Sequence, residues 1–408
     1  MSDLNNLFQF LEESRDGMVD LQRKLNCIPA LSPENGGSGE LKKAEALLVW
    51  LKEQGFTEIE VIKAPDTRVE SGVRPNIVVT IPGQEKEKRI WIMSHLDIVP
   101  PGELNLWESD PYSIVEKDGR IYGRGVEDNQ QGLTASVFTA LAFLKKGIKP
   151  KNTLKLLFVA DEETASKYGI VYLLKKQGFF QKGDWFLVPD GGRKDGTMLE
   201  VAEKSVLWVN FHTIGKQCHA STPEQGINAF VAASDLVTRL FGLKNIYPQK
   251  DPLFDPPVST FTPTRKESNV PNINTIPGDD VFSMDMRILP SLSVDEVLGK
   301  IDELCREVEK GYGVTINREI VQRVESEPTK ADAPLVKAMR EVVKSVYGVE
   351  AQPVGIGGGT VGAYLRNEGY DTVVWAKIDE TAHMPNEYCI LENCIGDAKV
   401  IAALSLKY

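Results

Sequence analysis

The sequence predicts an α/β fold, in which helices flank a mostly parallel mixed sheet and a smaller domain is inserted into the chain. In the first half, short strands that are apolar on both faces alternate with amphipathic helices, a pattern typical of a sheet buried on both sides. From about Val206 the strands carry one polar face, and after residue 324 the first pattern returns. The length of 408 residues also exceeds what one hydrophobic core usually supports.

The first part of the larger domain is expected to span residues 1–205. Its first clear helix covers 41–55 and stops at Gly55, a residue typical of helix C-caps. The remaining predicted strands and helices alternate along the chain. They are strands at 76–81, 90–99, 154–163 and 185–192, and helices at 131–147 and 168–178.

The inserted domain is expected to span residues 206–324, and 325–408 complete the larger domain. Strands are predicted at 206–215, 258–264, 280–289 and 313–324, and helices at 228–242 and 293–310. Ser293 followed by Glu296 is a capping-box pattern. The βαββαβ order predicts a ferredoxin-like sandwich. A helix at 333–348 and a strand at 372–378 return to the earlier pattern.

Composition restricts the classes of partner. The net charge is −11, from 47 basic and 58 acidic residues, and the absence of a basic stripe argues against nucleic acid. Five scattered cysteines indicate neither a disulfide framework nor a cysteine zinc site, which fits a reducing compartment. Neither a signal-peptide core nor an apolar stretch near the ~20 residues of a membrane span is present. We therefore expect a cytoplasmic protein with no membrane partner.

Polar residues follow four of the predicted strands at their carboxyl ends. His95 and Asp97 lie two residues apart, hence on one face of a strand, which alone favours a surface pair over a site. The other strands run into Asp161, Glu162 and Glu163, into Asp190, and into Asp379, Glu380 and His383, while Asp128 lies in a glycine-rich loop before a helix.

Ligands bind at this edge of open α/β sheets, where crowded carboxylates repel one another unless a cation neutralises them. Histidine and carboxylate without cysteine suit zinc or a similar metal, in a number sufficient for two ions that share one bridging ligand.

These motifs resemble the di-zinc family that includes aminoacylase, acetylornithine deacetylase, succinyl-diaminopimelate desuccinylase and glutamate carboxypeptidase. The matching segments, from about Leu21 to the C-terminus, include "SHLDIVPPG", "GRGVEDNQQG", "DEE", "PDGG" and "ETAHMPNE". The resemblance implies a zinc-peptidase-like fold and two Zn²⁺ ions per chain, for which Co²⁺ or Mn²⁺ can substitute. One ion would take His95, Asp128 and Asp190, and the other Asp128, Glu163 and His383. It also implies that Asp97 orients His95, that Glu162 is the general base, and that the Asp128–Asn129 peptide bond is cis.

The inserted domain resembles the lid of the same family. His219, in "GKQCHASTPEQGINA", matches the histidine that stabilises the oxyanion, commonly across a dimer interface, which implies a homodimer through this domain. Asn274 and Arg287 match residues that contact the substrate carbonyl or carboxylate. Gly358 and Thr360, in "GIGGGTVGAY", match the glycine loop that holds the substrate carboxylate.

Two segments depart from the family pattern. "NQQG" stands after Asp128 where a lysine and a Gly-Gly pair are usual, and Val361 stands where an acidic or hydroxyl residue is usual. Neither departure affects a predicted metal ligand, but both leave the substrate open.

The resemblance implies a metal-dependent hydrolase of C–N amide bonds, whose nucleophile is a metal-bound hydroxide formed near neutral pH. Its substrate would be a small molecule or short peptide with a free carboxylate. A dipeptidase or carboxypeptidase is favoured, because Asp190 rather than glutamate is typical of the peptidase branch. An N-acyl-amino-acid deacylase is the alternative. A non-catalytic binding relative would have lost Glu162 or a ligand, and a dinuclear phosphoesterase would favour basic phosphate clamps.

Overall fold

The computed structural model describes residues 2–408, which divide into two compact units. The first unit contains the chain up to Val201, Thr329–Val354 and Tyr364–Tyr408. The second contains Ala202–Pro328 and Gly355–Ala363. Each unit is described separately below.

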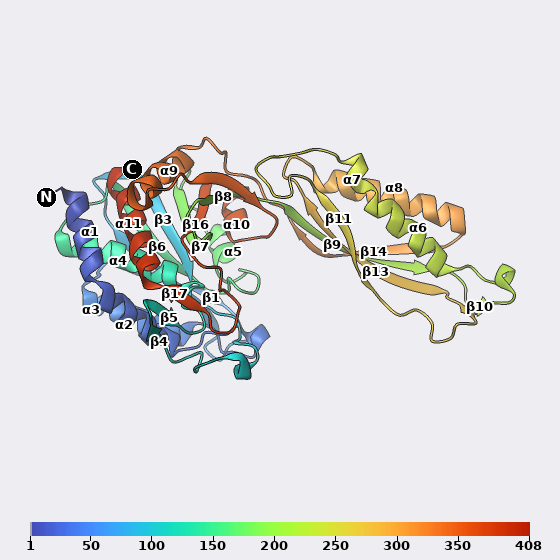
Figure 1. Cartoon of the computed structure of the whole chain (residues 1–408), viewed down its shortest axis with the longest axis horizontal. Helices are drawn as coiled ribbons and strands as arrows, with labels where there is room; N and C mark the ends of the chain where they lie inside the picture. The colour runs from blue at the N-terminus through green and yellow to red at the C-terminus, as the bar shows by residue number, and fades with distance from the viewer. Residues whose placement is uncertain (1) are drawn as a thin grey trace. The chain divides into compact units, whose positions relative to one another are not determined.

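An eight-stranded mixed sheet forms the centre of the first unit, in the order β1-β2-β6-β3-β7-β16-β8-β15 (Figure 1). The pairs β6–β3, β3–β7 and β7–β16 are parallel, while β1–β2, β2–β6 and β16–β8 are antiparallel. The strands are β1 (Ile59–Pro65), β2 (Val73–Ile81), β3 (Glu85–His95), β6 (Asn152–Val159), β7 (Trp185–Gly192), β8 (Met198–Glu203), β15 (Gln352–Ile356) and β16 (Asp371–Ala376). The predicted α/β class is confirmed, and the four parallel strands are those whose ends carry the polar motifs.

The central strands form because their side chains are apolar on both faces. The last six residues of β3 are all buried, and the last four of β6 likewise. The register pairs Ile90 with Leu154 and Ile92 with Leu156. Such strands must be covered on both sides.

Helices supply that cover. Helix α4 (Gln130–Lys146) is buried over most of its length and contacts β3, β6 and β7 as well as α11 (Leu391–Lys407). The others are α1 (Asp3–Glu13), α2 (Arg15–Asn26), α3 (Leu41–Gln54), α5 (Ile170–Leu174), α9 (Pro334–Tyr347) and α10 (Gly362–Asn367). The helix predicted over 168–178 is only α5, because 175–178 are exposed and bury no apolar face.

Short elements complete the first unit. A three-stranded sheet joins β4 (Val115–Lys117), β5 (Arg120–Tyr122) and β17 (Tyr388–Ile390). Short 3-10 helices cover Pro33–Asn35 and Leu104–Leu106 in this unit, and Pro223–Gln225 in the second.

The second unit is a ferredoxin-like sandwich. Its antiparallel sheet has the order β11-β13-β9-β14, and α6 and α8 pack on it (Figure 1). The stacked rings of Phe211 and Phe282, 5.0 Å apart, lie in its core. The elements are β9 (Ser205–Ile214), β10 (Cys218–His219), α6 (Ala229–Phe241), α7 (Leu243–Ile246), β11 (Thr260–Lys266), β12 (Thr275–Ile276), β13 (Asp279–Ile288), α8 (Val294–Tyr312) and β14 (Thr315–Val324).

The segment 355–363 belongs to the second unit, whereas the sequence pattern predicts it in the larger domain. Backbone and side-chain contacts explain the difference. Lys204 N–H donates to the carbonyl of Ile356 at 3.0 Å, and Arg287 Nη1 donates to that of Gly357 at 3.0 Å. The glycine loop is therefore bound to the residue before β9 and to β13 of the inserted domain.

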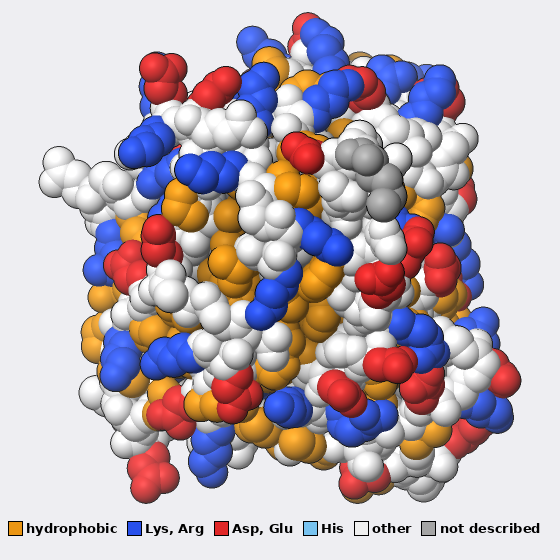
Figure 2. All heavy atoms as spheres, turned by 90° about the vertical axis from the view of Figure 1, so that its left-hand side faces the viewer, with side chains coloured by type: hydrophobic (Ala, Val, Ile, Leu, Met, Phe, Trp, Pro, Cys, Tyr) orange, Lys and Arg blue, Asp and Glu red, His pale blue; other side chains and the backbone are white. Residues whose placement is uncertain are grey.

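Within residues 2–408, no helix is long and apolar enough to cross a membrane. Basic and acidic side chains are interspersed on the face of the molecule that Figure 2 shows.

Candidate metal centre

The carboxyl ends of four adjacent strands bring the predicted ligands together. His95 is the last residue of β3, Glu162 and Glu163 follow β6, and Asp190 lies near the end of β7. His383 lies in the loop after β16, and Asp128 in the loop between β5 and α4. Because these strands run parallel and side by side in the order β6-β3-β7-β16, their ends share one edge.

The His95 side chain is buried and its Nε2 faces carboxylates. Nε2 lies 2.8 Å from Asp128 Oδ1, 3.6 Å from Asp190 Oδ1 and 4.0 Å from Glu162 Oε2. Its Nδ1 lies 3.0 Å from the carbonyl oxygen of Asp97, which can only accept, so Nδ1 carries a proton. A neutral His95 therefore directs its Nε2 lone pair at carboxylate oxygens, and only a proton or another cation between them satisfies this arrangement.

His383 faces the other oxygen of the shared carboxylate. Its Nε2 lies 3.1 Å from Asp128 Oδ2 and 3.1 Å from Glu163 Oε2. The two oxygens of Asp128 thus face two different imidazoles. His383 adopts φ +62°, a left-handed conformation that is uncommon for a non-glycine residue and frequent at functional sites. The Asp128–Asn129 bond is cis, as predicted.

The Asp97 carboxylate holds the turn that carries the two glutamates. Its Oδ1 accepts the backbone N–H of Glu162 and its Oδ2 that of Glu163, both at 3.0 Å. Its Oδ1 lies 3.6 Å from His95 Nδ1, farther than the Asp97 carbonyl. Asp97 therefore links His95 to the Glu162–Glu163 turn, with its carbonyl contacting the ring and its carboxylate the turn.

A buried ion pair supports the same turn from behind. Asp161 begins it with φ +65°. Its N–H donates to Glu40 Oε1 at 3.2 Å, and its carboxylate lies 3.6 Å from Arg74 Nη1. Arg74 also donates to both oxygens of Glu40, and both side chains are fully buried. The left-handed residue is thus fixed by a charged network.

The electrostatics reflect crowded acids. Burial, with Asp190 and Glu163 nearby, raises the pKa of Glu162 well above its usual range despite the opposing effect of His95. Burial also raises the pKa of Asp190. Burial opposes protonation of His95, but Asp190 and Asp128 outweigh it and raise its pKa. Hydrogen bonds to Asp128 and Glu163 raise the pKa of His383 to about 10.

These donors fit divalent cations. Side-chain donor atoms lie within 4.8 Å of one another in two groups, His95 with Glu162 and Asp190, and His95 with Asp128 and Glu163. The buried Oε1 of Glu163 has no hydrogen-bond partner among residues 2–408. Two imidazoles and several carboxylates, without cysteine, are the ligands that zinc and similar metals take.

Glu387 supports the site and was not identified from the sequence. Its carboxylate accepts the N–H groups of Gly125, Glu127 and Asp128 at 2.9–3.0 Å, and it pairs with Arg124 at 2.7 Å. Burial raises its pKa to about 7. It follows His383 by four residues in "ETAHMPNE". Its complete burial distinguishes it from a surface acid, and burial is seen in the structure but not in the sequence.

The predicted lid residues form two groups in the second unit, one at the small β10-β12 sheet (β10 is labelled in Figure 1) and one near the far end of β13. His219 and Asn274 are exposed, and Ala220 N–H donates to the carbonyl of Asn274 at 2.9 Å, where β10 pairs with β12. Arg287, whose strand partner is Val206, lies near the other end of β13.

The second group of predicted lid residues surrounds Arg287. Its guanidinium contacts Asp285 at 2.8 and 3.0 Å and the carbonyl of Gly357. Gly358 is exposed. Thr360 donates from N–H and Oγ1 to the two oxygens of Glu203, at 2.9 and 2.7 Å.

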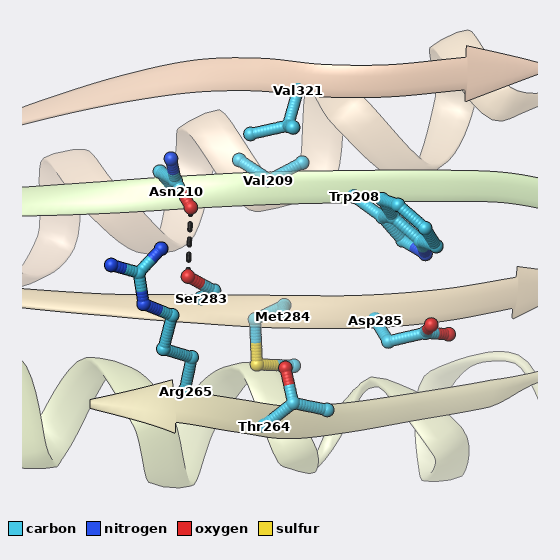
Figure 3. A pocket seen from close by; sticks show the side chains of 9 residues that line it. All are labelled: Trp208, Val209, Asn210, Thr264, Arg265, Ser283, Met284, Asp285 and Val321. Carbon is cyan, nitrogen blue, oxygen red and sulfur yellow. Dashed lines mark hydrogen bonds between the residues drawn. The ribbon is translucent and has the colours of Figure 1, made fainter. Parts of the chain in front are cut away.

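A hollow of about 360 Å³ lies on the same sheet and includes Trp208 and Asp285 in its lining (Figure 3). Ser283 Oγ donates to Asn210 Oδ1 at 2.7 Å across it. None of the predicted site residues lines it.

Imidazoles and carboxylates grouped at the carboxyl ends of parallel strands form a candidate metal site. The model of peptidase family M20/M25/M40 matches residues 91–407, and the chain belongs to that family. It is therefore an enzyme, a metallohydrolase of the peptidase or deacylase type.

Relatives and solved structures agree with this family. An uncharacterized metallohydrolase of Methanococcus maripaludis is 40% identical, with 94% of this chain and 97% of the relative covered. A succinyl-diaminopimelate desuccinylase of Nitratiruptor is 23% identical, with 91% of this chain and 94% of the relative covered. Aminopeptidase PepT from Bacillus cereus has a TM-score of 0.76 at 19% identity, over 96% and 98% of the chains. A dinuclear metal binding peptidase of the M20 family from Bacillus subtilis has a TM-score of 0.64 at 16% identity, over 97% and 98%.

Proposed function

We propose that the protein is a two-metal peptidase that hydrolyses the amide bond of a short peptide with a free carboxylate. One observation carries this proposal: the two oxygens of Asp128 face His95 and His383 separately, at 2.8 and 3.1 Å. A carboxylate with an imidazole at each oxygen is suited to bridge two cations. His95 and Asp190 would complete one ion's ligands, and Glu163 and His383 the other's.

Two Zn²⁺ ions per chain, or Co²⁺ or Mn²⁺ in their place, are the proposed cofactors. Bound there, they supply Lewis acidity that polarises the scissile carbonyl and lowers the pKa of water towards ~7. The Bacillus subtilis neighbour, a dinuclear metal binding peptidase, supports the number of two ions.

Glu162 is the proposed general base. Burial raises the pKa of its carboxyl, which suits a group that takes a proton from water and returns it to the leaving amine near neutral pH. Its backbone N–H is fixed by Asp97, so the side chain starts from a defined position. Glu163 cannot share this role while its oxygens bind an ion.

Substrate binding is assigned to the second unit. The planar fork of Arg287 suits a carboxylate, with Gly358 and Thr360 as further contacts at the same end of the unit. Asn274 lies beside His219 at the other end and would contact the substrate from there. In the structure this fork is held by Asp285, so a substrate carboxylate would compete with that pair. An N-acyl-amino-acid deacylase is the second candidate, since several relatives are named succinyl-diaminopimelate desuccinylase.

A homodimer through the second unit accounts for the separation of the lid residues. Between Asp279 and Arg287 the strand β13 spans roughly 25 Å at ~3.3 Å per residue, and His219 lies beyond Asp279. One small substrate cannot reach both residues within one second unit, so a partner copy would supply His219 as the oxyanion donor. Sedimentation velocity at micromolar concentration should give a dimer, and a monomer with full activity would contradict this arrangement.

The test of the mechanism is Glu162→Gln. We expect turnover to fall at least ~10²-fold while metal content stays that of the wild type, because the variant removes proton transfer and no ligand. Glu380→Gln, at an exposed acid after β16, is the matched control and should keep its activity. Retained turnover in Glu162→Gln would remove this residue from its role.

The substrate class is tested with a panel of dipeptides, C-terminally blocked peptides, and N-acetyl- and N-succinyl-amino acids, each with added Zn²⁺, Co²⁺ or Mn²⁺. Hydrolysis of free-carboxylate dipeptides and not of blocked ones is expected. Preference for N-succinyl substrates would favour the deacylase instead.

A further inference from the structure

Asn129, the residue after the proposed bridging Asp128, holds another proposed ligand. Its Nδ2 donates to Asp190 Oδ1 at 2.6 Å and to the carbonyl of Pro189 at 2.7 Å. Both partners can only accept, so the amide must present its nitrogen to them. The side chain is buried, and its Oδ1 has no partner among residues 2–408. The side-chain amide of Asn129 therefore makes its hydrogen bonds to Pro189 and Asp190 on β7.

Glu127, the residue before Asp128, holds the opposite side of the centre. Its Oε1 accepts the N–H of Asp379 at 2.7 Å. Its Oε2 accepts the N–H of Thr381, the hydroxyl of Thr381 at 2.8 Å and the N–H of Ala382 at 3.1 Å. Glu127 is buried, so these donors replace its water. All four belong to the segment that ends at His383, whose φ is +62°.

The two contacts divide between the two proposed ions. Asn129 touches a ligand that would serve only the ion at His95. Glu127 holds the backbone that leads to a ligand of the ion at Glu163. The sequence offers no sign of this division, because the partners lie 60 and 61 residues away from Asn129 and 252–255 residues away from Glu127.

We propose that Asn129 and Glu127 are positioning residues for different metal ions: Asn129 orients Asp190 for one, and Glu127 fixes the loop of His383 for the other. This inference rests on the proposed two-ion centre. Groups that orient metal ligands typically change metal affinity roughly 10–100-fold when removed. Each substitution should therefore lower the affinity for one ion and leave the affinity for the other unchanged. A general loss of stability would not separate the two affinities.

Gln131 is a matched control in the same segment. It is buried, and its Nε2 also donates twice, to the carbonyl of Lys377 at 2.9 Å and to Asp397 Oδ2 at 2.8 Å. Neither partner is a proposed ligand. Gln131→Met should lower thermal stability and leave both metal affinities unchanged.

The experiment is calorimetric titration of the metal-free full chain with Zn²⁺ alone, which reads affinity and not activity. The wild type should take up two ions. Asn129→Leu should lower the affinity for one ion, and Glu127→Met the affinity for the other, by roughly 10–100-fold. In the Asp190→Ala background, Asn129→Leu should cause no further loss of Zn²⁺ affinity, whereas in the His383→Ala background it should cause its full loss. Glu127→Met should show the reverse, with no further loss in His383→Ala and its full loss in Asp190→Ala.

The milder Asn129→Ser and Glu127→Gln variants, checked by circular dichroism, repeat the test if the first pair fails to fold. The inference would be overturned, while the two-ion centre stands, if a variant lowered the affinity for both ions equally or changed neither affinity. The same change in Gln131→Met would also overturn it. A wild type that binds no Zn²⁺ would instead overturn the proposed function and this inference together.

Discussion

At the scale of single residues, the first unit contains a charged group that is costly to bury. Lys43, on α3, is fully buried, and its Nζ has no hydrogen-bond partner among residues 2–408. Burial lowers the pKa of its ammonium to about 8, although Asp97 and Glu40 oppose the shift. An unpaired buried ammonium is destabilising, and an apolar side chain of similar length avoids that cost.

Lys43→Met should raise the free energy of unfolding at pH 7 by about 1–3 kcal/mol, measured by urea denaturation. The wild type should gain stability as pH rises from about 8 towards 10.5, since the unfolded chain binds more protons in that window. The variant should lack this gain. Lys42→Met, at the exposed neighbour, should change stability by less than ~0.5 kcal/mol. A destabilised Lys43→Met would mean that the ammonium has a partner, such as a buried water.

At the scale of elements, the close contact between α4 and β7 sets the position of Asp190. Gly132 lies in the first turn of α4, and a Cβ there would stand 2.3 Å from the carbonyl oxygen of Pro189. The helix can approach β7 so closely only because this residue has no side chain.

Gly132→Ala should therefore destabilise the protein by about 1–3 kcal/mol, because the clash is with backbone that cannot move cheaply. Gly299→Ala, in the middle of α8, is the control. A Cβ there meets nothing within 4 Å, and alanine should stabilise the helix by up to ~1 kcal/mol. Thermal denaturation measures both, and equal effects at the two glycines would contradict the packing argument.

The junction of α4, α9 and α11 contains a buried acid, Asp397. It accepts hydrogen bonds from Gln131 at 2.8 Å and the Tyr347 hydroxyl at 2.9 Å. Burial nevertheless raises its pKa from 3.8 to about 7.

A raised folded-state pKa makes the contribution of Asp397 to stability depend on pH. The contribution is fully present below pH 3.8 and is lost as pH rises through about 7. Relative to Asp397→Asn, the wild type should lose about 1–3 kcal/mol of unfolding free energy between pH 4.5 and 7.5. Urea midpoints across that range measure it, and parallel curves for the two proteins would be the contrary result.

Comparison of elements shows what the sequence could predict. The strands β3, β6 and β7 could be found because apolar residues occupy both faces until a polar residue follows, as at His95. The edge strand β1 could not be predicted, because only two of its seven residues are buried and a lysine and a terminal proline weaken the strand pattern. Asn129 and Glu127 could not be assigned, because a side-chain amide or an acid in a loop acquires its partner only when distant strands are assembled.

At the scale of the whole molecule, the chain consists of two units that carry different groups of the predicted site residues. The first places acids and imidazoles at one sheet edge, and the second presents Arg287 with the glycine loop at one end and His219 at the other. The glycine loop joins the second unit although it lies after residue 354, so the chain crosses between the units more often than the change of pattern at Val206 predicts.

The central claim is that catalysis depends on a two-ion centre built on Asp128. The most direct test is elemental analysis of the purified full chain, coupled to its hydrolysis of a free-carboxylate dipeptide before and after chelation. We expect close to two zinc-type ions per chain, loss of hydrolysis when chelation removes them, and recovery when Zn²⁺ is returned. Full hydrolysis by protein that contains no metal after chelation would contradict the account.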